Sequence, residues 1–297
     1  MVFKKMLSSL GIGGPSVDTV LDTPTVRPGG LVRGNVHIKG GEVEVGIDYL
    51  ALGLTTRVET ESGDHEYSSN QEFFRVDLSG PFTLAAKEER SLPFEFTIPW
   101  ETPVTEVYGQ HLRGMSMGVR TELAVAKAVD KSDLDALAVA PLPGQLKVLE
   151  AFQQLGFEFR SADLERGYLR NVRQELPFYQ EIEFYPPRHV GGINQVELTF
   201  VASPQGLDIV LEADKRGGMF THGGDTFLHL QLSNAELDRT DIAAQIDSWI
   251  RRIASGGGHH GGGHRRHGHG GHHRGSVAGG IAGGLLGGMI LGDILDG

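Results

Sequence analysis

The stretch VEVGIDYLALGL, residues 43–54, decides the fold class of this chain. Its first half is apolar at every second position: Val43, Val45, Ile47 and Tyr49. This period of two places side chains on one face of a β-strand. The apolar phase then slips by one residue, to Leu50, Leu52 and Leu54. In so long a strand the slip indicates a β-bulge, so we expect a long, bent strand.

The period of two recurs along the chain: in Leu92, Phe94, Phe96 and Ile98, in Val196, Leu198 and Phe200, and in Leu228, Leu230 and Leu232. Turn sequences such as Pro28-Gly29-Gly30 and Ser203-Pro204-Gln205-Gly206 separate strands and suit antiparallel hairpins. An α/β fold would need a crossover helix after nearly every strand, and that pattern is missing. The sequence therefore predicts an all-β protein made of two antiparallel β-sandwich domains with short helices.

Helical patterns are confined to three stretches. The first is Phe3 to Leu10, and the second runs from about Gln145 to Leu155, with Gly156 as its left-handed stop. The third has an apolar stripe, with Thr240 as its expected N-cap, formed by Ile242, Ile246, Trp249, Ile250 and Ile253. Such a stripe must pack against another element.

The length of 297 residues suggests more than one domain, and Pro141-Leu142-Pro143-Gly144 is the clearest punctuation between domains. We expect an N-terminal helical segment (1–14) followed by two sandwich domains (15–140 and 145–235). An amphipathic helix (238–254), a low-complexity linker rich in His and Gly (256–274) and a glycine-zipper-like terminal segment (275–297) come after them.

Charge and cysteine content limit the partners and the compartment. The chain has 38 acidic and 27 basic residues, a formal net charge of −11, which is the wrong sign for binding nucleic acid. It has no cysteine, as is common in a reducing compartment. The segment after Lys4 and Lys5 is too short and too polar for an export signal. We therefore expect a cytoplasmic protein that does not bind nucleic acid.

Several segments, in order and spacing, resemble the bacterial sporulation-control protein family. They are Phe3-Lys-Lys-Met-Leu, Leu92-Pro-Phe-Glu-Phe-Thr-Ile-Pro, Arg120-Thr-Glu-Leu, Asp130-Lys-Ser-Asp-Leu-Asp and Leu176-Pro-Phe-Tyr-Gln-Glu-Ile-Glu-Phe. The resemblance covers most of residues 1–253. It implies an arrestin-like fold of two sandwiches joined by a short linker. It also implies a non-enzymatic regulatory role in sporulation or cell-cycle control, with protein partners.

The histidines of the tail form a candidate metal site: His259, His260, His264, His267, His269, His272 and His273. Imidazoles on a flexible glycine-rich chain can chelate Zn²⁺, Ni²⁺ or Cu²⁺, and they become cationic on mild acidification. A solvated low-complexity linker with adventitious metal binding explains the same composition. Both interpretations stay open, and we expect no resident cofactor.

Residues 275–292 carry no charge and would span about 27 Å as a helix, just short of a hydrocarbon core. A tandem glycine series favours close helix contacts in lipid: Gly280, Gly284, Gly288 and Gly292. In water the same glycines disfavour a helix. The segment from Gly275 to Gly292 is thus a candidate for membrane or self-association, the alternative being a disordered end.

No catalytic motif is present. The chain lacks a phosphate loop, a dinucleotide fingerprint, a zincin motif and a nucleophile elbow. His222 and Asp225 are better explained by a glycine-rich turn, while His37, His229 and the acidic strand faces fit solvated surfaces. We nominate no catalytic residue. The leading hypothesis is a regulatory scaffold that binds an unidentified protein, and the alternative is a metal or proton sensor based on the histidine-rich tail.

Overall fold

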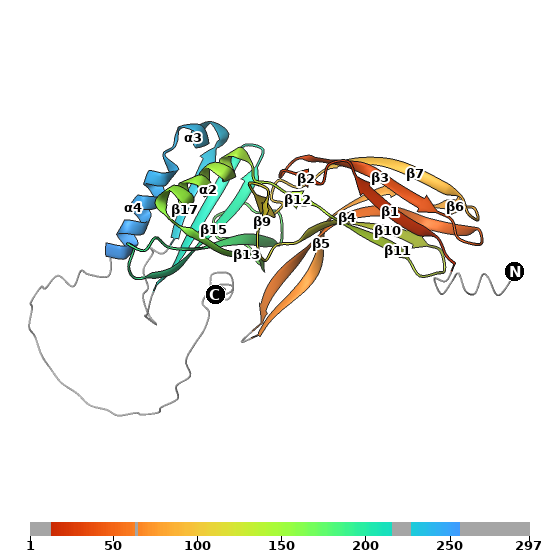
Figure 1. The fold of residues 1–297 in the computed structure, drawn as a ribbon, viewed down its shortest axis with the longest axis horizontal. Helices are drawn as coiled ribbons and strands as arrows, with labels where there is room; N and C mark the ends of the chain where they lie inside the picture. The colour runs from red at the N-terminus through yellow and green to blue at the C-terminus, as the bar shows by residue number, and fades with distance from the viewer. Residues whose placement is uncertain (1–12, 63–64, 216–226, 256–297) are drawn as a thin grey trace, which may run out of the picture.

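The computed structural model describes residues 13–62, 65–215 and 227–255. The molecule is long, with strands along its whole length and helices at one end (Figure 1). The prediction of a mostly β protein is confirmed. The segment Phe3 to Leu10, the pair His222 and Asp225, and the tail from Gly256 on lie outside the described residues.

The N-terminal half consists of two facing sheets. The smaller sheet is antiparallel, in the order β1 (Ser16–Leu21), β3 (Leu31–Lys39) and β7 (Glu89–Thr97). The facing sheet contains β4 (Val45–Ser62), β5 (His65–Ser79), β6 (Phe82–Leu84), β10 (Met117–Val125) and β11 (Lys131–Ala136). Apolar side chains from both sheets, such as Val36, Leu52 and Val119, meet in one buried cluster. Burial of this cluster holds the two layers together.

The bulge expected in the first quoted stretch is present in β4. Against β10, Ala124 pairs with Tyr49 and Val125 pairs with Ile47, so Asp48 is the extra residue. The insertion brings Ile47 and Leu50 to the same buried side although they are three positions apart. The phase slip in the sequence was therefore a correct sign of a bent strand.

In the C-terminal half the large sheet continues without a break. Strand β4 makes one parallel bridge to β13, and the order then runs antiparallel through β13 (Glu158–Arg166), β14 (Phe178–Tyr185), β15 (Ile193–Ser203), β16 (Gly206–Lys215) and β17 (Phe227–Ser233). The buried side of this sheet carries Val196, Leu198 and Phe200, as their spacing predicts.

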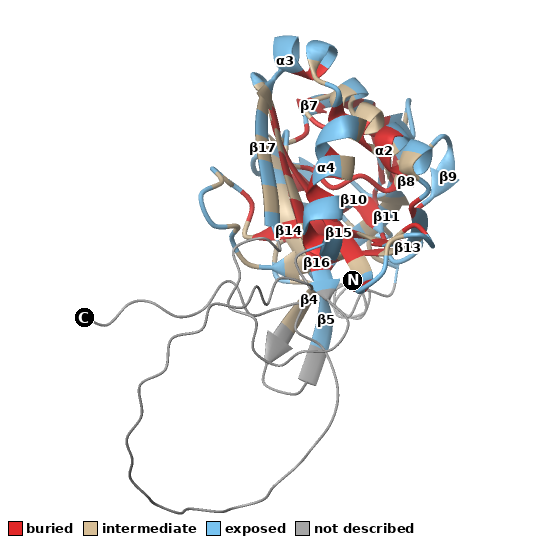
Figure 2. Cartoon of the chain, turned by 90° about the vertical axis from the view of Figure 1, so that its left-hand side faces the viewer, coloured by how far each residue is buried: buried red, intermediate tan, exposed pale blue. Residues whose placement is uncertain are grey.

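Three helices cover that buried side: α2 (Pro143–Leu155), α3 (Asn234–Arg239) and α4 (Ile242–Ser255). Figure 2 shows the buried residues between α2, α4 and the strands behind them. The apolar stripe of α4 is buried along its length, and Gly156 ends α2 in the left-handed conformation with φ of 85°. The second layer here is thus helical, whereas the sequence led us to expect a second β-sandwich. The apolar sides of two amphipathic helices, α2 and α4, cover the apolar face of the sheet, so no second sheet is needed to bury it.

The N-cap of α4 differs from the expectation. Thr240 ends α3, since its backbone N–H and its hydroxyl both donate to the carbonyl of Glu236. Asp241 caps α4 instead, because its Oδ1 accepts a hydrogen bond of 2.9 Å from the N–H of Ala244. A carboxylate at this position also stabilises the positive end of the helix dipole.

Short ladders order the connecting segments of the N-terminal half, and Val58, Val104 and Gln180 join that half to the C-terminal one. Short ladders join β2 (Thr25–Val26) to β12 (Ala138–Val139), and β8 (Glu106–Val107) to β9 (Gln110–His111). The buried cluster of the C-terminal half also contains Val58 of β4 and Val104. The side-chain amide of Gln180 makes two buried hydrogen bonds to the backbone of Val104.

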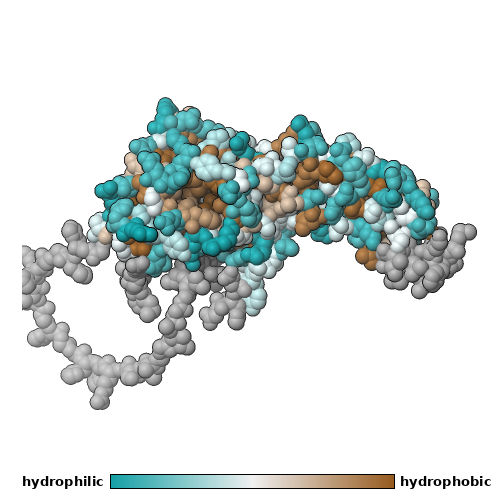
Figure 3. All heavy atoms as spheres, in the orientation of Figure 1, coloured by the Kyte–Doolittle hydropathy of each residue, from teal (hydrophilic) through white to brown (hydrophobic). Residues whose placement is uncertain are grey.

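The outer surface is largely hydrophilic on the face shown in Figure 3, with apolar groups gathered in patches on both halves. None of the helices between residues 13 and 255 that the structure describes has the length and apolarity needed to span a membrane.

Candidate functional site

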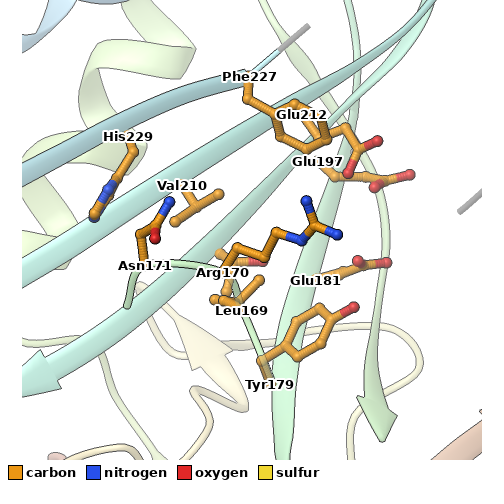
Figure 4. A pocket seen from close by; sticks show the side chains of 11 residues that line it. Leu169, Arg170, Asn171, Tyr179, Glu181, Glu197, Val210, Glu212, Phe227 and His229 are labelled. Atoms are coloured by element: carbon orange, nitrogen blue, oxygen red, sulfur yellow. The ribbon is translucent and has the colours of Figure 1, made fainter. Parts of the chain in front are cut away.

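A cavity of about 310 Å³ opens on the face of the C-terminal sheet that points away from the helices (Figure 4). Strands β14 to β17 form its floor, and the turn between β13 and β14 forms one wall. Its acidic side chains are Glu181, Glu197 and Glu212. We call this site the acidic pocket. Its volume lies at the lower end of the range for small-molecule sites.

Strand register brings the acidic side chains together. Glu183 pairs with Glu197, and Glu197 pairs with Glu212, which makes a row across β14, β15 and β16. Glu181 pairs with Asp163 of β13 in the neighbouring row. Like charges in directly opposed positions repel each other across a sheet. The arrangement therefore costs stability unless the carboxyl groups hold protons or meet a cation.

The acidic side chains differ in their hydrogen bonds. Glu183 is satisfied by Gln195 and by an ion pair of 3.5 Å with Arg160. Glu197 is 8% exposed and accepts a hydrogen bond of 2.6 Å from Gln195. Glu181 is 9% exposed, yet within the described part of the chain it has no hydrogen-bond or ion-pair partner. A buried carboxyl without a partner is costly, which marks Glu181 as the most unusual group of the pocket.

The surroundings shift the acidity of these groups. Burial, followed by the charges of Glu197 and Asp214, raises the pKa of Glu212 to about 8. Burial, followed by the charge of Glu197, raises the pKa of Glu181 well above its ordinary value. Asp163 has a pKa of about 8 because of burial and the charge of Glu183, and its Oδ1 is buried without a partner. The surroundings therefore favour the protonated form of these carboxyl groups, and Glu212 in the pocket and Asp163 beside it hold protons at neutral pH.

Gln174 makes the largest number of side-chain hydrogen bonds within the wall of the pocket, and the carboxylate of Glu101 holds the same turn by accepting from the N–H groups of Glu175 and Leu176. Gln174 donates from Nε2 to the carbonyls of Gly167, Leu176 and Phe178, and its Oε1 accepts from the N–H of Leu169 at 3.1 Å. The turn that Gln174 closes carries Arg170 and Asn171 into the lining.

Arg170 is exposed, and its guanidinium is turned toward the three glutamates in Figure 4. It forms no ion pair within 4.0 Å with those glutamates, all of which the structure describes. Asn171, the next residue, has a φ of 59°, in the left-handed region. This conformation lets the turn reverse over the sheet.

The rest of the lining is apolar, aromatic or neutral. Val210, Phe227 and Tyr179 provide apolar surface beside the carboxyl groups. At the far end, Nε2 of His229 lies 2.7 Å from Oδ1 of Asp208. The pocket thus combines an acidic floor with apolar walls, an arrangement suited to a ligand that has both a positive group and an aliphatic part.

Sequence reasoning missed this site. The sequence predicts solvated surfaces at the acidic strand faces and at His229. His229 is exposed, as predicted, at the edge of the pocket, but Glu181 and Glu197 are buried. The signal was present, because glutamates occupy the phase opposite to the core residues in three adjacent strands. What periodicity cannot show is that the turn around Arg170 folds over this face.

The metal site predicted from sequence is not brought into this pocket. All its histidines, His259, His260, His264, His267, His269, His272 and His273, lie outside the described residues. Between residues 13 and 255, as far as the structure describes them, no group of three or more His, Asp or Glu side chains is arranged to hold a metal ion. Metal binding by the tail stays a prediction.

Comparisons with known proteins agree with the resemblance noted from sequence. The family model described as SpoOM protein matches residues 3–217. Sporulation-control protein spo0M of Bacillus subtilis (strain 168) is 34% identical over 253 residues, which is 82% of this chain and 95% of that protein. The crystal structure of Spo0M, sporulation control protein, from Bacillus subtilis matches with a TM-score of 0.70 and 32% identity, covering 81% of this chain and 99% of that one.

Proposed function

Because the chain belongs to the SpoOM protein family, we propose that it is a non-enzymatic regulator of sporulation or cell-cycle control that acts by binding proteins. The observation that carries the proposal is the extent of the match. It covers 95% of a sporulation-control protein in sequence and 99% of a Spo0M structure in fold. A shared fold over the whole relative supports a shared role better than a local motif does.

Edge strands support binding as the mode of action. In the described part of the large sheet, β11 and β17 stand at the two ends, each with a pairing partner on one side. The edge of β17 can accept a strand from another protein, whereas β1 lies beside β11, where the N–H of Thr19 donates to Oδ2 of Asp133 at 2.8 Å. Leu134 on β11 is 62% exposed, so an apolar side chain is also presented there. We propose β11 as one contact surface for the protein partner.

Complementation tests the regulatory role. The full chain is expressed in Bacillus subtilis that lacks its own sporulation-control protein spo0M, and heat-resistant spores are counted. We expect the spore count to return toward that of the parent strain. A folded chain, expressed at the level of the native protein, that leaves the count unchanged would contradict the proposal.

The same assay tests the contact surface on β11. Leu134→Glu places a charge on the exposed side chain and should abolish complementation while the free energy of unfolding stays within about 0.5 kcal/mol. Leu31→Glu is the matched control, since Leu31 is also exposed but lies on β3. Equal complementation by both variants would exclude β11 as the contact.

We further propose that the two halves form the two lobes of an arrestin-like regulator that works in the cytoplasm. The separate buried clusters of the N-terminal and C-terminal halves support two lobes. The lack of cysteine supports a reducing compartment.

The second candidate function is a metal- or pH-responsive sensor that uses the histidine-rich tail, with membrane or self-association through residues 275–292. The observation in its favour is the density of imidazoles between His259 and His273. Calorimetry with Zn²⁺ at pH 7.5 compares the full chain with a chain ending at Ser255. Loss of complementation in the shortened chain together with loss of Zn²⁺ binding would favour the sensor over the scaffold.

A further inference from the structure

We propose that the acidic pocket binds an alkylammonium or guanidinium group carried on an aliphatic chain. The inference goes beyond the role in sporulation and does not depend on it. It rests on the placement of Glu181, on the shape of the pocket and on the position of Arg170.

Glu181 is the central observation. Its side chain is more than nine-tenths buried, lines the cavity, and has no hydrogen-bond or ion-pair partner in the described chain. With no protein partner among the described residues, this carboxyl group depends for its hydrogen bonds on what occupies the cavity. An N–H donor that enters the cavity provides them, and a cationic donor does so with a stronger, charge-assisted bond. Glu197 and Glu212, which pair across β15 and β16, offer further hydrogen-bond acceptors beside Glu181.

The shape of the pocket favours an organic cation over a metal ion. The cavity of about 310 Å³ has room for roughly ten water molecules, far more than a bare ion needs. The described carboxylates do not converge in a set that could hold a metal. Val210 and Phe227 offer an apolar wall to methylene groups, and the ring of Tyr179 beside Glu181 can face a positive charge.

Arg170 shows what kind of group the pocket attracts. Its guanidinium points from the exposed turn toward the carboxyl groups without reaching ion-pair distance (Figure 4). It therefore acts at the rim as a weak competitor, because its charge repels another cation that approaches the same carboxylates. Removal of this charge should make binding of an external cation tighter.

Protons compete with the ligand as well. Charged or titratable groups face the cavity or adjoin it from every strand around it: Asp163 and Glu165 on β13, Tyr179, Glu181 and Glu183 on β14, Glu197 on β15, Asp208, Glu212 and Asp214 on β16, His229 on β17, and Arg170 on the turn. Several of these carboxyl groups retain protons at neutral pH, whereas an aliphatic amine stays charged up to about pH 10. Binding should therefore release protons and should be tighter at pH 9 than at pH 6.

The shared chemistry can come from two sources: a free aliphatic diamine, or a lysine side chain of another protein. Isothermal titration calorimetry of the full chain at pH 8.5 uses one probe for each source. Cadaverine stands for the free diamine, and the peptide Ac-Gly-Gly-Lys-Gly-Gly-NH₂ stands for the protein. The probe that binds more tightly identifies the source.

Three variants locate the binding. We expect Glu181→Gln to weaken binding of the better probe about tenfold or more, since it removes a charge-assisted acceptor. Arg170→Ala should strengthen binding. Glu95→Gln is the matched control, because Glu95 is an exposed glutamate on β7 in the other half, and it should leave the affinity unchanged.

The proposal is overturned if neither probe gives saturable binding. It is also overturned if Glu181→Gln and Glu95→Gln have the same affinity as the parent chain, because the cation then binds elsewhere on the acidic surface. Gln has the shape of the protonated carboxyl group of Glu181, so this variant should remain folded. Arg170→Ala changes only an exposed side chain and provides a second, opposite readout. Failure of complementation in spores would leave these results untouched.

Discussion

Gln174 controls the wall of the acidic pocket through four hydrogen bonds to the backbone of its own turn. In Gln174→Ala these backbone groups lose their partner, and each net hydrogen bond is worth about 1 kcal/mol. We expect the free energy of unfolding to fall by about 2 kcal/mol in urea denaturation, with faster amide exchange across residues 167–176.

Gln231→Ala is the control for this prediction. Gln231 is an exposed glutamine on β17, so its removal should change stability by less than about 0.5 kcal/mol. If both variants lose the same stability, the turn around Arg170 is held by other contacts.

The carboxyl group of Glu212 makes stability depend on pH. Its pKa is about 8 in the folded chain, because of burial and then the charges of Glu197 and Asp214, against 4.5 in an unfolded chain. Between these values the folded state holds more protons, so the free energy of unfolding falls as pH rises from about 4.5 to about 8 and then levels off. Glu212→Gln should flatten this dependence, as measured by denaturation at pH 5, 6.5 and 8. A variant whose curve is as steep as that of the parent chain would contradict the prediction.

Helix α4 is stabilised by packing and not by its own sequence alone. Ile246 is fully buried in the cluster shared with β15 and β16. Ile246→Ala should cost about 2–5 kcal/mol, since a large core side chain is lost and a cavity remains. Chemical denaturation measures the change, and Gln245→Ala, one position along on the exposed face, should stay within about 0.5 kcal/mol. Equal losses would mean that α4 is only loosely docked.

The elements that could be predicted from sequence are those set by local periodicity. The bulge at Asp48 followed from a slip in apolar phase, and the end of α2 at Gly156 followed from the conformational freedom of glycine. What covers each face could not be predicted, because an apolar strand face accepts a helix as readily as a second sheet. The apolar stripe of α4 could be predicted because it is a local pattern. Its packing against β13–β17 could not, because local periodicity does not show which element covers which face.

The acidic pocket was out of reach for a related reason. A glutamate in the outward phase of a strand has the same local pattern whether water or a turn lies above it. Contacts between groups far apart in the local sequence, such as those of Gln174 across the turn and of Glu101 with Glu175 and Leu176, place Arg170 over Glu181. The resemblance to a known family indicated a mostly β protein and left this face undescribed.

Across the whole molecule, β4 belongs to both halves. Val58 near its far end is fully buried in the C-terminal cluster, although its neighbours in sequence belong to the N-terminal half. Val58→Ala should cost about 2 kcal/mol by loss of buried methyl groups. Amide exchange should rise in β13 and β14 more than in β3 and β7. A rise confined to β3 and β7 would contradict the assignment of Val58 to the C-terminal cluster.

The length of β4 has a mechanical consequence. Eighteen residues of one extended strand reach about 60 Å, and hydrogen bonds to β5 and β10 stiffen it on both sides. These ladders fasten β4 within the N-terminal half, whereas its pairing with the C-terminal sheet is a single bridge between Glu59 and Glu165, so bending between the halves is expected to strain that bridge before the ladders.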